Sequence, residues 1–201
     1  MSSNRPKTED KIKQAALRVF TAKGYDATTT RDIAKEADVN IASLHYYFRS
    51  KDKLFSEVAG ETLSEFNNIL HRVMMGDEPL KLKIHQFVEQ FTDFYKKHPK
   101  LPAFIMSESA RNESMLHQII SFRDHSMVLA NQLEELIAKG EIRPITILDF
   151  MSNLVGLMIF PFMSKHIFEN EFQLTEAEFH QLLESRKQSI PNMIISDLYM
   201  V

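Results

Sequence analysis

Hydrophobic side chains recur three or four residues apart along almost the whole chain, and no alternating pattern of useful length appears. This spacing places the apolar side chains on one face of a helix, so the sequence predicts an all-α protein. The pattern indicates about nine helices. They are expected over residues 8–23, 29–37, 41–48, 50–75, 80–97, 102–110, 113–139, 146–168 and 175–198.

Several of these helices carry recognisable end signals. Thr29 and Asp32 have the spacing of a capping box, in which two side chains satisfy the free N–H groups of a helix start. Thr175 and Glu178 repeat that spacing at the last helix. Gly24 is placed to end the first helix in the left-handed conformation. These signals support the expected helix bounds.

Residues 29–48 have the arrangement of a helix-turn-helix. Two short helices joined by a tight turn need a small residue where their axes cross, which is Ala34, and a turn residue that accepts positive φ, which is Asp38. Val39 and Leu44 are expected to fix the second helix against the first. The second helix then presents a face suited to a DNA major groove. That face holds Asn40, Ile41, Ser43, His45, Tyr46 and Tyr47.

Four stretches of the N-terminal region resemble the signature of the tetracycline-repressor (TetR) family. They run from Ala15 to Tyr25, from Thr29 to Ala37, from Val39 to Leu44 and from Tyr47 to Leu54. The resemblance covers residues 8–55, and beyond them it rests on length and helix count.

Two residues depart from the family pattern. Asp38 stands where the turn usually has Gly, and His45 stands where the recognition helix more usually has Tyr. The base preference of relatives therefore does not carry over at His45.

The resemblance implies a homodimeric transcriptional repressor that leaves a palindromic operator when a small apolar effector binds. Residues 1–50 are the expected helix-turn-helix DNA-binding domain, and residues 51–201 the expected helical effector-binding and dimerisation domain. Lys51 begins a helix, where a cation opposes the helix dipole unless a DNA phosphate docks there. The candidate DNA contacts are Thr28, Thr29, Thr30, Asn40, Ile41, Ser43, His45, Tyr46, Tyr47 and Lys51.

The effector is expected in an apolar cavity of the second domain. Most of the eleven Met and fifteen Phe lie after residue 60, and such side chains line adaptable pockets as well as cores. Helical spacing puts some of them on two facing walls, and three polar residues are candidates for orienting the ligand. The candidate residues are Phe91, Tyr95, Phe104, Glu108, Met115, Ile119, Phe122, His125, Phe150 and Asn153.

The dimer interface is expected on the last two long helices, residues 146–168 and 175–198. Their apolar content exceeds what one face can bury, and Gly156 permits close approach, so two copies are expected to form a four-helix bundle. The alternative is that these helices are buried all round within one chain. The apolar residues behind this expectation are Leu154, Leu157, Met158, Phe160, Phe162, Leu182, Leu183, Ile190 and Ile194.

Charge and composition agree with this reading. Residues 1–60 hold 11 Lys and Arg against 8 Asp and Glu, whereas the remainder holds 13 against 19, for a net charge of −3. A basic head on an acidic body indicates an anionic partner at one end only. The absence of cysteine excludes disulfides, thiolate metal sites and cysteine nucleophiles.

Other functional classes lack their sequence signals. No Glu-x-x-His of a ferritin-like di-iron enzyme occurs, and the pairs Glu113/His117 and His85/Glu89 are read as surface pairs, so no enzyme, metal or cofactor is expected. The longest uncharged stretch, 150–164, falls short of the ~20 apolar residues needed to span a bilayer. A cytoplasmic protein without a signal peptide is expected. The runner-up function is a helical DNA-binding adaptor without a small-molecule effector.

Overall fold

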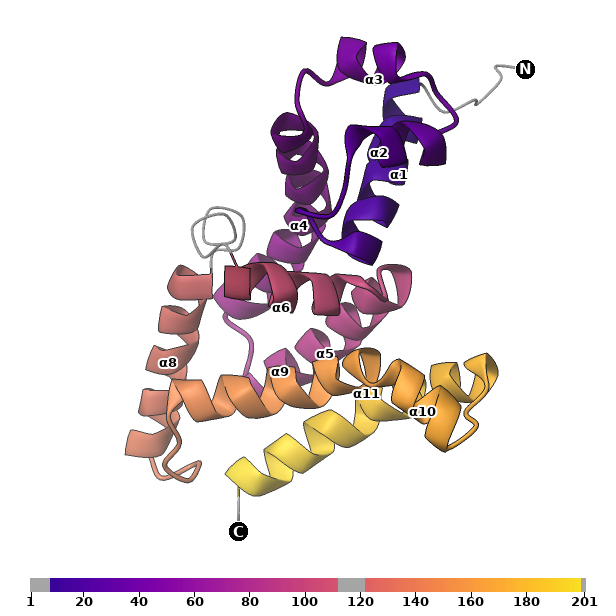
Figure 1. Cartoon of the computed structure of the whole chain (residues 1–201). Helices are drawn as coiled ribbons and strands as arrows, with labels where there is room; N and C mark the ends of the chain where they lie inside the picture. The colour runs from indigo at the N-terminus through magenta and orange to yellow at the C-terminus, as the bar shows by residue number, and fades with distance from the viewer. Residues whose placement is uncertain (1–7, 112–121, 200–201) are drawn as a thin grey trace, which may run out of the picture. The chain divides into compact units, whose positions relative to one another are not determined.

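The computed structural model describes residues 8–111 and 122–199, and every regular element within them is a helix (Figure 1). The all-α prediction is therefore confirmed. Ten helices are described, where about nine were expected along the whole chain. They are α1 (Thr8–Lys23), α2 (Thr30–Glu36), α3 (Ile41–Tyr47), α4 (Lys51–Met75), α5 (Leu80–Lys97), α6 (Leu101–Arg111), α8 (Phe122–Ala138), α9 (Ile147–Met163), α10 (Lys165–Glu171) and α11 (Glu176–Leu198).

The contacts divide the chain into two compact units. The first comprises residues 1–65 and 103–120, and so contains α1, α2, α3, the beginning of α4 and most of α6. The second comprises residues 66–102 and 121–201. Each unit has its own apolar core.

In the first unit α1 packs against α2, and α2 packs against α3. Ile12 of α1, Ile33 of α2 and Leu44 of α3 are fully buried. The ring of Phe55 on α4 lies 4.9 Å from that of Phe20 and 5.9 Å from that of Phe104 on α6, measured between centroids. These ring contacts therefore join α1, which carries Phe20, to α4 and α6.

The second unit is built around α5, which packs against α9 and α11. The ring of Phe91 lies 4.9 Å from Phe66 and 4.4 Å from Phe87. Two ion pairs then tie α5 to α11. Lys187 Nζ lies 2.6 Å from Asp93 Oδ1, and Lys96 Nζ lies 2.5 Å from Glu184 Oε1. The core and these pairs fix α11 to α5 within one chain.

A proline lies inside α9 without ending it. Pro161 has no N–H to donate to the carbonyl of Leu157, one turn earlier, and that carbonyl would otherwise lose its helical partner. Arg186 of α11 donates its Nη2 hydrogen to this oxygen at 2.7 Å. Burial lowers the pKa of Arg186. The two helices are thus joined at the point where the proline leaves an acceptor open.

The expected helix over 146–168 is wrong at its end. α9 stops at Met163, Ser164 has a non-helical cap conformation, and α10 starts at Lys165. The two helices meet at a bend of 52°. The apolar spacing continues through the bend, so periodicity alone did not reveal it. The start expected at residue 113 for the preceding helix lies outside the described residues.

No single helix in the described ranges is both long enough and apolar enough to cross a membrane.

Candidate nucleic-acid interface

The start of α2 is fixed by the capping box that the sequence predicted. Thr29 Oγ1 accepts a hydrogen bond from the Asp32 N–H at 3.1 Å, and Asp32 Oδ2 accepts one from the Thr29 N–H at 3.0 Å. Lys23 of α1 adds an ion pair to Asp32 at 2.9 Å. The bonds from Thr29 and Lys23 hold the pKa of Asp32 well below its usual range. The box therefore fixes the start of α2, and the ion pair with Lys23 links that start to α1.

The turn from α2 to α3 takes the form that a helix-turn-helix requires. Asp38 has φ 53°, which confirms the predicted positive φ. The Val39 N–H donates to the Ala34 carbonyl at 3.0 Å across the turn. Asn40 then caps α3, because its Oδ1 accepts from the Ser43 N–H at 2.7 Å. The second helix is thereby held at a fixed angle to the first.

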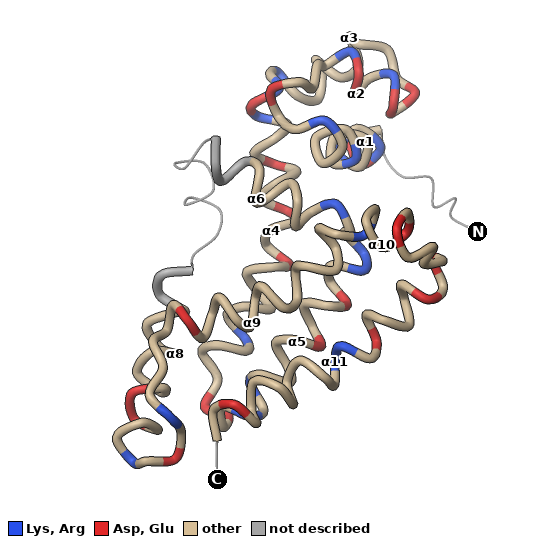
Figure 2. Tube along the Cα trace, turned by 60° about the horizontal axis from the view of Figure 1, so that its bottom comes forward, with Lys and Arg blue, Asp and Glu red and all other residues tan. Residues whose placement is uncertain are grey.

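The outward face of α3 carries the residues expected to meet DNA bases. Leu44 is fully buried, whereas Tyr46 is 83% exposed and Ile41 and Tyr47 are about 40% exposed. His45 is also exposed. Their exposure leaves these four side chains available to a partner. α3 contains no Lys or Arg, although charged residues of both signs surround it on α1 and α2 (Figure 2).

Lys51 joins the start of α4 to the loop between α1 and α2. Its Nζ donates to the carbonyls of Tyr25 at 3.0 Å and Thr28 at 3.1 Å, and it lies 4.1 Å from the centre of the Tyr25 ring. The Tyr25 hydroxyl donates to Asp52. Burial, reinforced by this bond, raises the pKa of Tyr25 to about 12. Lys51 thus holds the loop between α1 and α2 against the start of α4, and its contact with a phosphate stays a prediction.

The remaining predicted contacts differ in accessibility. Thr28 is 1% exposed, and its hydroxyl donates to the Gly24 carbonyl at 2.7 Å. Thr30 and Ser43 are half-buried. Contacts of these three residues with DNA stay predictions.

Other residues of this face were not selected from the sequence. Arg31 and Lys35 on α2 and Arg49 just after α3 are exposed, and their charges suit contacts with phosphates. Tyr25 contacts both Lys51 and Asp52. Its signals in the sequence were its place directly after the turn residue Gly24 and at the end of the first stretch that resembles the family. Isolated surface cations give no periodic pattern, so the sequence did not distinguish them.

The residues proposed for the effector are distributed over both units. Phe91 and Tyr95 lie on one face of α5, as expected, with ring centres 6.2 Å apart, and both are buried in the aromatic core. Phe150 and His125 are also buried, the latter with its ring 5.6 Å from that of His71. The other candidates are Phe104 in the first unit, Asn153 on the surface, Met115 and Ile119 outside the described residues, and Glu108 and Phe122, whose side chains the structure does not describe.

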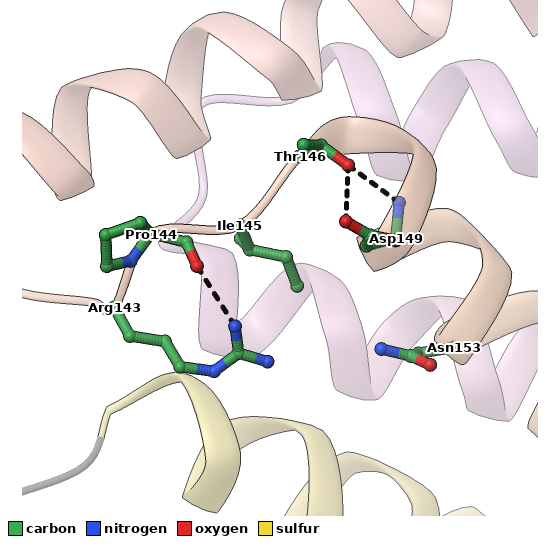
Figure 3. Close-up of a pocket in the computed structure, with 6 residues that line it drawn as sticks. All are labelled: Arg143, Pro144, Ile145, Thr146, Asp149 and Asn153. Atoms are coloured by element: carbon green, nitrogen blue, oxygen red, sulfur yellow. Dashed lines mark hydrogen bonds between the residues drawn. The ribbon is translucent and has the colours of Figure 1, made fainter.

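An open pocket of about 460 Å³ lies where α9 begins. Asn153 is the one effector candidate among its lining residues, so the pocket does not coincide with the expected cavity. Among the described residues, no group of three or more His, Asp or Glu side chains is placed to hold a metal ion. The lining residues are Arg143, Pro144, Ile145, Thr146, Asp149 and Asn153 (Figure 3).

Six of the nine residues expected at the dimer interface are buried within their own chain, whereas Phe160 is exposed and Leu157 and Leu182 are half-buried. Leu183 and Ile190 of α11 are 2% and 1% exposed because they face the core of their own chain, so they are not free to meet a second copy. Leu154, Met158, Phe162 and Ile194 are buried in the same way. The exposed side of α9 instead carries Leu148, Ser152, Asn153, Gly156, Phe160 and Met163.

Two family models match this chain. The model of bacterial regulatory proteins of the tetR family matches residues 12–58, and that of the tetracyclin repressor-like C-terminal domain matches residues 81–194. The second match alone covers more than half of the chain. The chain belongs to the TetR family. It is a DNA-binding transcriptional regulator with a helix-turn-helix, and its family and relatives are regulators rather than enzymes.

Relatives and solved structures place it among TetR regulators. It is 27% identical over 177 residues to IcaR, the negative regulator of the biofilm operon icaADBC of Staphylococcus aureus, covering 86% of this chain and 91% of that protein. It is 28% identical to the repressor NicS of Pseudomonas putida over 69% of this chain and 61% of that protein. The structure of the hemolysin II regulator HlyIIR matches with a TM-score of 0.67 and 24% identity, over 96% and 98% of the two chains.

Proposed function

We propose that this TetR regulator is a homodimeric repressor that binds an inverted-repeat operator through two copies of α3 and leaves it when a small apolar effector binds. The exposed face of α3 carries the proposal. Ile41, His45, Tyr46 and Tyr47 extend outward from a helix whose Leu44 is fully buried. A rigid helix with hydrogen-bonding and apolar side chains on one exposed face has the properties needed in a major groove.

The two DNA-binding domains of a dimer contact successive major grooves only if the dimer spaces their α3 helices by whole turns of the duplex. The exposed side of α9 supports such a dimer. Leu148 is 74% exposed and Phe160 is 60% exposed, and Gly156 lies between them. A two-fold axis beside this face brings equivalent surfaces of two copies together.

The effector half of the proposal is supported by the apolar content of the second unit and by one structural neighbour that was solved with an acyl-CoA. One structural neighbour, FadR of Bacillus subtilis, was solved in complex with stearoyl-CoA, at 18% identity and a TM-score of 0.64 over 94% of this chain and 98% of that chain. A ligand releases DNA only through a difference in its affinity for the two states of the repressor. The packing of Phe91 against Tyr95 favours the alternative, an adaptor without an effector, because it fills space that a ligand would need.

DNA binding is tested by fluorescence anisotropy on duplexes that carry inverted repeats, over a range of salt concentrations. Tyr46→Ala should weaken binding, and changes at Ser43 or His45 should alter the preferred bases. Lys51→Ala should weaken all sequences about equally and reduce the salt slope by roughly one per head. Lys100→Ala, an exposed lysine in the second unit, is the matched control. Equal salt slopes for wild type and Lys51→Ala would exclude the phosphate contact.

The effector is tested with stearoyl-CoA and the corresponding free fatty acid as probes. Thermal stabilisation of the protein together with release of the operator supports ligand control. If neither stearoyl-CoA nor the free fatty acid changes a tight operator binding, the result favours the adaptor.

A further inference from the structure

His45 lies on the outward side of α3, beside two side chains that have no hydrogen-bonding group. Leu44 is fully buried, and with about 3.6 residues per turn His45 lies about 100° around the helix from it. One turn earlier on the same side are Ile41 and Ala42, both exposed. Ala42 adds little bulk, so this side of α3 can approach the edges of base pairs closely. His45 is the polar contact on that side.

The other hydrogen-bonding side chains of α3 and its cap discriminate less between bases. Asn40 Oδ1 already accepts from the Ser43 N–H at 2.7 Å, so the oxygen that an amide needs for its two-bond contact with adenine is engaged. The hydroxyls of Ser43, Tyr46 and Tyr47 both donate and accept, so they suit either kind of base edge. The rings of the two tyrosines also pack edge to face, with centres 5.2 Å apart. His45, by contrast, has no hydrogen bond or ion pair with any residue in the described part of the chain.

An N–H donor distinguishes guanine from the other bases in the major groove. Guanine presents two acceptors side by side, N7 and O6, whereas adenine places its N6 amino donor beside N7. Cytosine offers only a donor, and the O4 acceptor of thymine lies beside a methyl group. The phosphates surround the groove with negative charge, which favours protonated ring nitrogens and therefore an imidazole that donates.

We propose that His45 selects a G·C base pair in each half-site of the operator by donating a hydrogen bond to guanine N7. This inference rests on the function proposed above, because α3 must lie in the major groove for His45 to meet a base. A side chain that contacts only phosphates, or only other protein groups, gives no preference for one base pair. One unfavourable base pair in a half-site should weaken binding roughly tenfold.

The test begins with an operator selected from random duplexes by the wild-type protein. Each base pair of a half-site and its symmetry mate is then replaced by the other three, and binding is measured by fluorescence anisotropy. One position should show a G·C preference of roughly tenfold. His45→Ala should bind all four base pairs there about equally, whereas His45→Asn should prefer A·T, because an amide pairs with N6 and N7 of adenine.

Lys35→Ala, at an exposed lysine of α2, is the matched control. It should weaken binding to all duplexes about equally and keep the G·C preference. His45 is exposed, so its variants should keep the far-UV circular dichroism spectrum of the wild type. A lost preference in a folded variant then reports the contact rather than unfolding.

Replacing the selected guanine by 7-deazaguanine removes N7 alone and so tests the contacted atom. Wild-type binding should weaken several-fold. Binding by His45→Ala should not change, because two changes that remove the same contact are not additive.

The outcomes separate this inference from the proposed function. A G·C preference that persists in His45→Ala overturns the inference and leaves operator binding intact. The same holds for an operator without a required G·C pair, and for 7-deazaguanine that leaves wild-type binding unchanged or weakens wild type and His45→Ala equally. A wild-type protein that selects no duplex at all contradicts the proposed function itself.

Discussion

At the scale of single residues, one of two positive-φ positions could be predicted from the sequence and the other could not. Asp38 and Gln173 have φ 53° and 54°, the left-handed region that favours glycine. Asp38 was predictable because it sits in the turn of a recognisable motif. Gln173 was not, because glutamine is not a typical turn residue and the end of α10 just before it gave no signal.

Replacing these residues by glycine should stabilise the protein. We expect Gln173→Gly to raise the free energy of unfolding by about 1 kcal/mol, since an L-residue is strained in this conformation. The free energy of unfolding should rise less for Asp38→Gly. Asp tolerates positive φ better than Gln does, and glycine adds conformational freedom to the unfolded chain. Urea unfolding followed by circular dichroism measures both. The alanine variants are controls, and equal gains from alanine and glycine would contradict the strain.

Because of Asp32, the free energy of unfolding of the first unit should fall at low pH. Its hydrogen bonds with Thr29 and Lys23 lower its pKa from the ordinary 3.8. Folding therefore favours the carboxylate, so this stabilisation is complete above pH 3.8 and is lost as the pH falls below it. Thr29→Val should weaken this dependence between about pH 5 and pH 2. Thr175→Val changes the capping box of α11 and is the control. It should leave the pH dependence of the first unit's stability unchanged.

At the scale of helices, most starts and ends could be predicted because capping residues are local. The capping boxes at Thr29 and Thr175 and the turn at Gly24 all appear where the sequence placed them. Pro161 lies within the helix predicted over 146–168 and would ordinarily break it, yet α9 continues through it. The reason is not local, since the compensating donor, Arg186, comes from another helix.

The bond from Arg186 to Leu157 should depend on Pro161. We expect Arg186→Met to lower the free energy of unfolding by about 2 kcal/mol, as for a charged donor to a carbonyl. In a Pro161→Ala background the loss should shrink by about 1 kcal/mol, because the new N–H reaches the same carbonyl. A double-mutant cycle by chemical denaturation measures this. Pro191→Ala is the control, and it should be additive with Arg186→Met.

At the scale of the whole molecule, the sequence predicted the fold class and the DNA-binding motif but assigned to the dimer interface several residues that are buried within one chain. Helical periodicity shows that α11 has an apolar face at Leu183 and Ile190, but not what covers it. In the structure α5 and α9 pack against α11 within the same chain, and both residues are buried. The exposed face of α9 is a weaker periodic signal, because small and polar residues interrupt it.

Charged substitutions should separate the core from the interface. Leu183→Glu buries an unpaired charge in the core and should unfold the second unit rather than give a folded monomer. Phe160→Glu should keep the fold, lower the sedimentation coefficient to that of a monomer and weaken operator binding. Leu82→Glu, at an exposed apolar residue of α5, is the control. A folded Leu183→Glu monomer would contradict the assignment of α11.

The absence of Lys and Arg from α3 has a consequence for how such a regulator diversifies. In the DNA complex proposed above, cations on the neighbouring segments attract the phosphates, whereas uncharged side chains and one histidine of α3 discriminate between bases. Substitutions on the outer face of α3 can therefore change the preferred operator while the sequence-independent affinity for DNA stays the same. A gene duplicate could acquire a different set of target promoters in a few steps, and it would never pass through a form that had lost the nucleic acid.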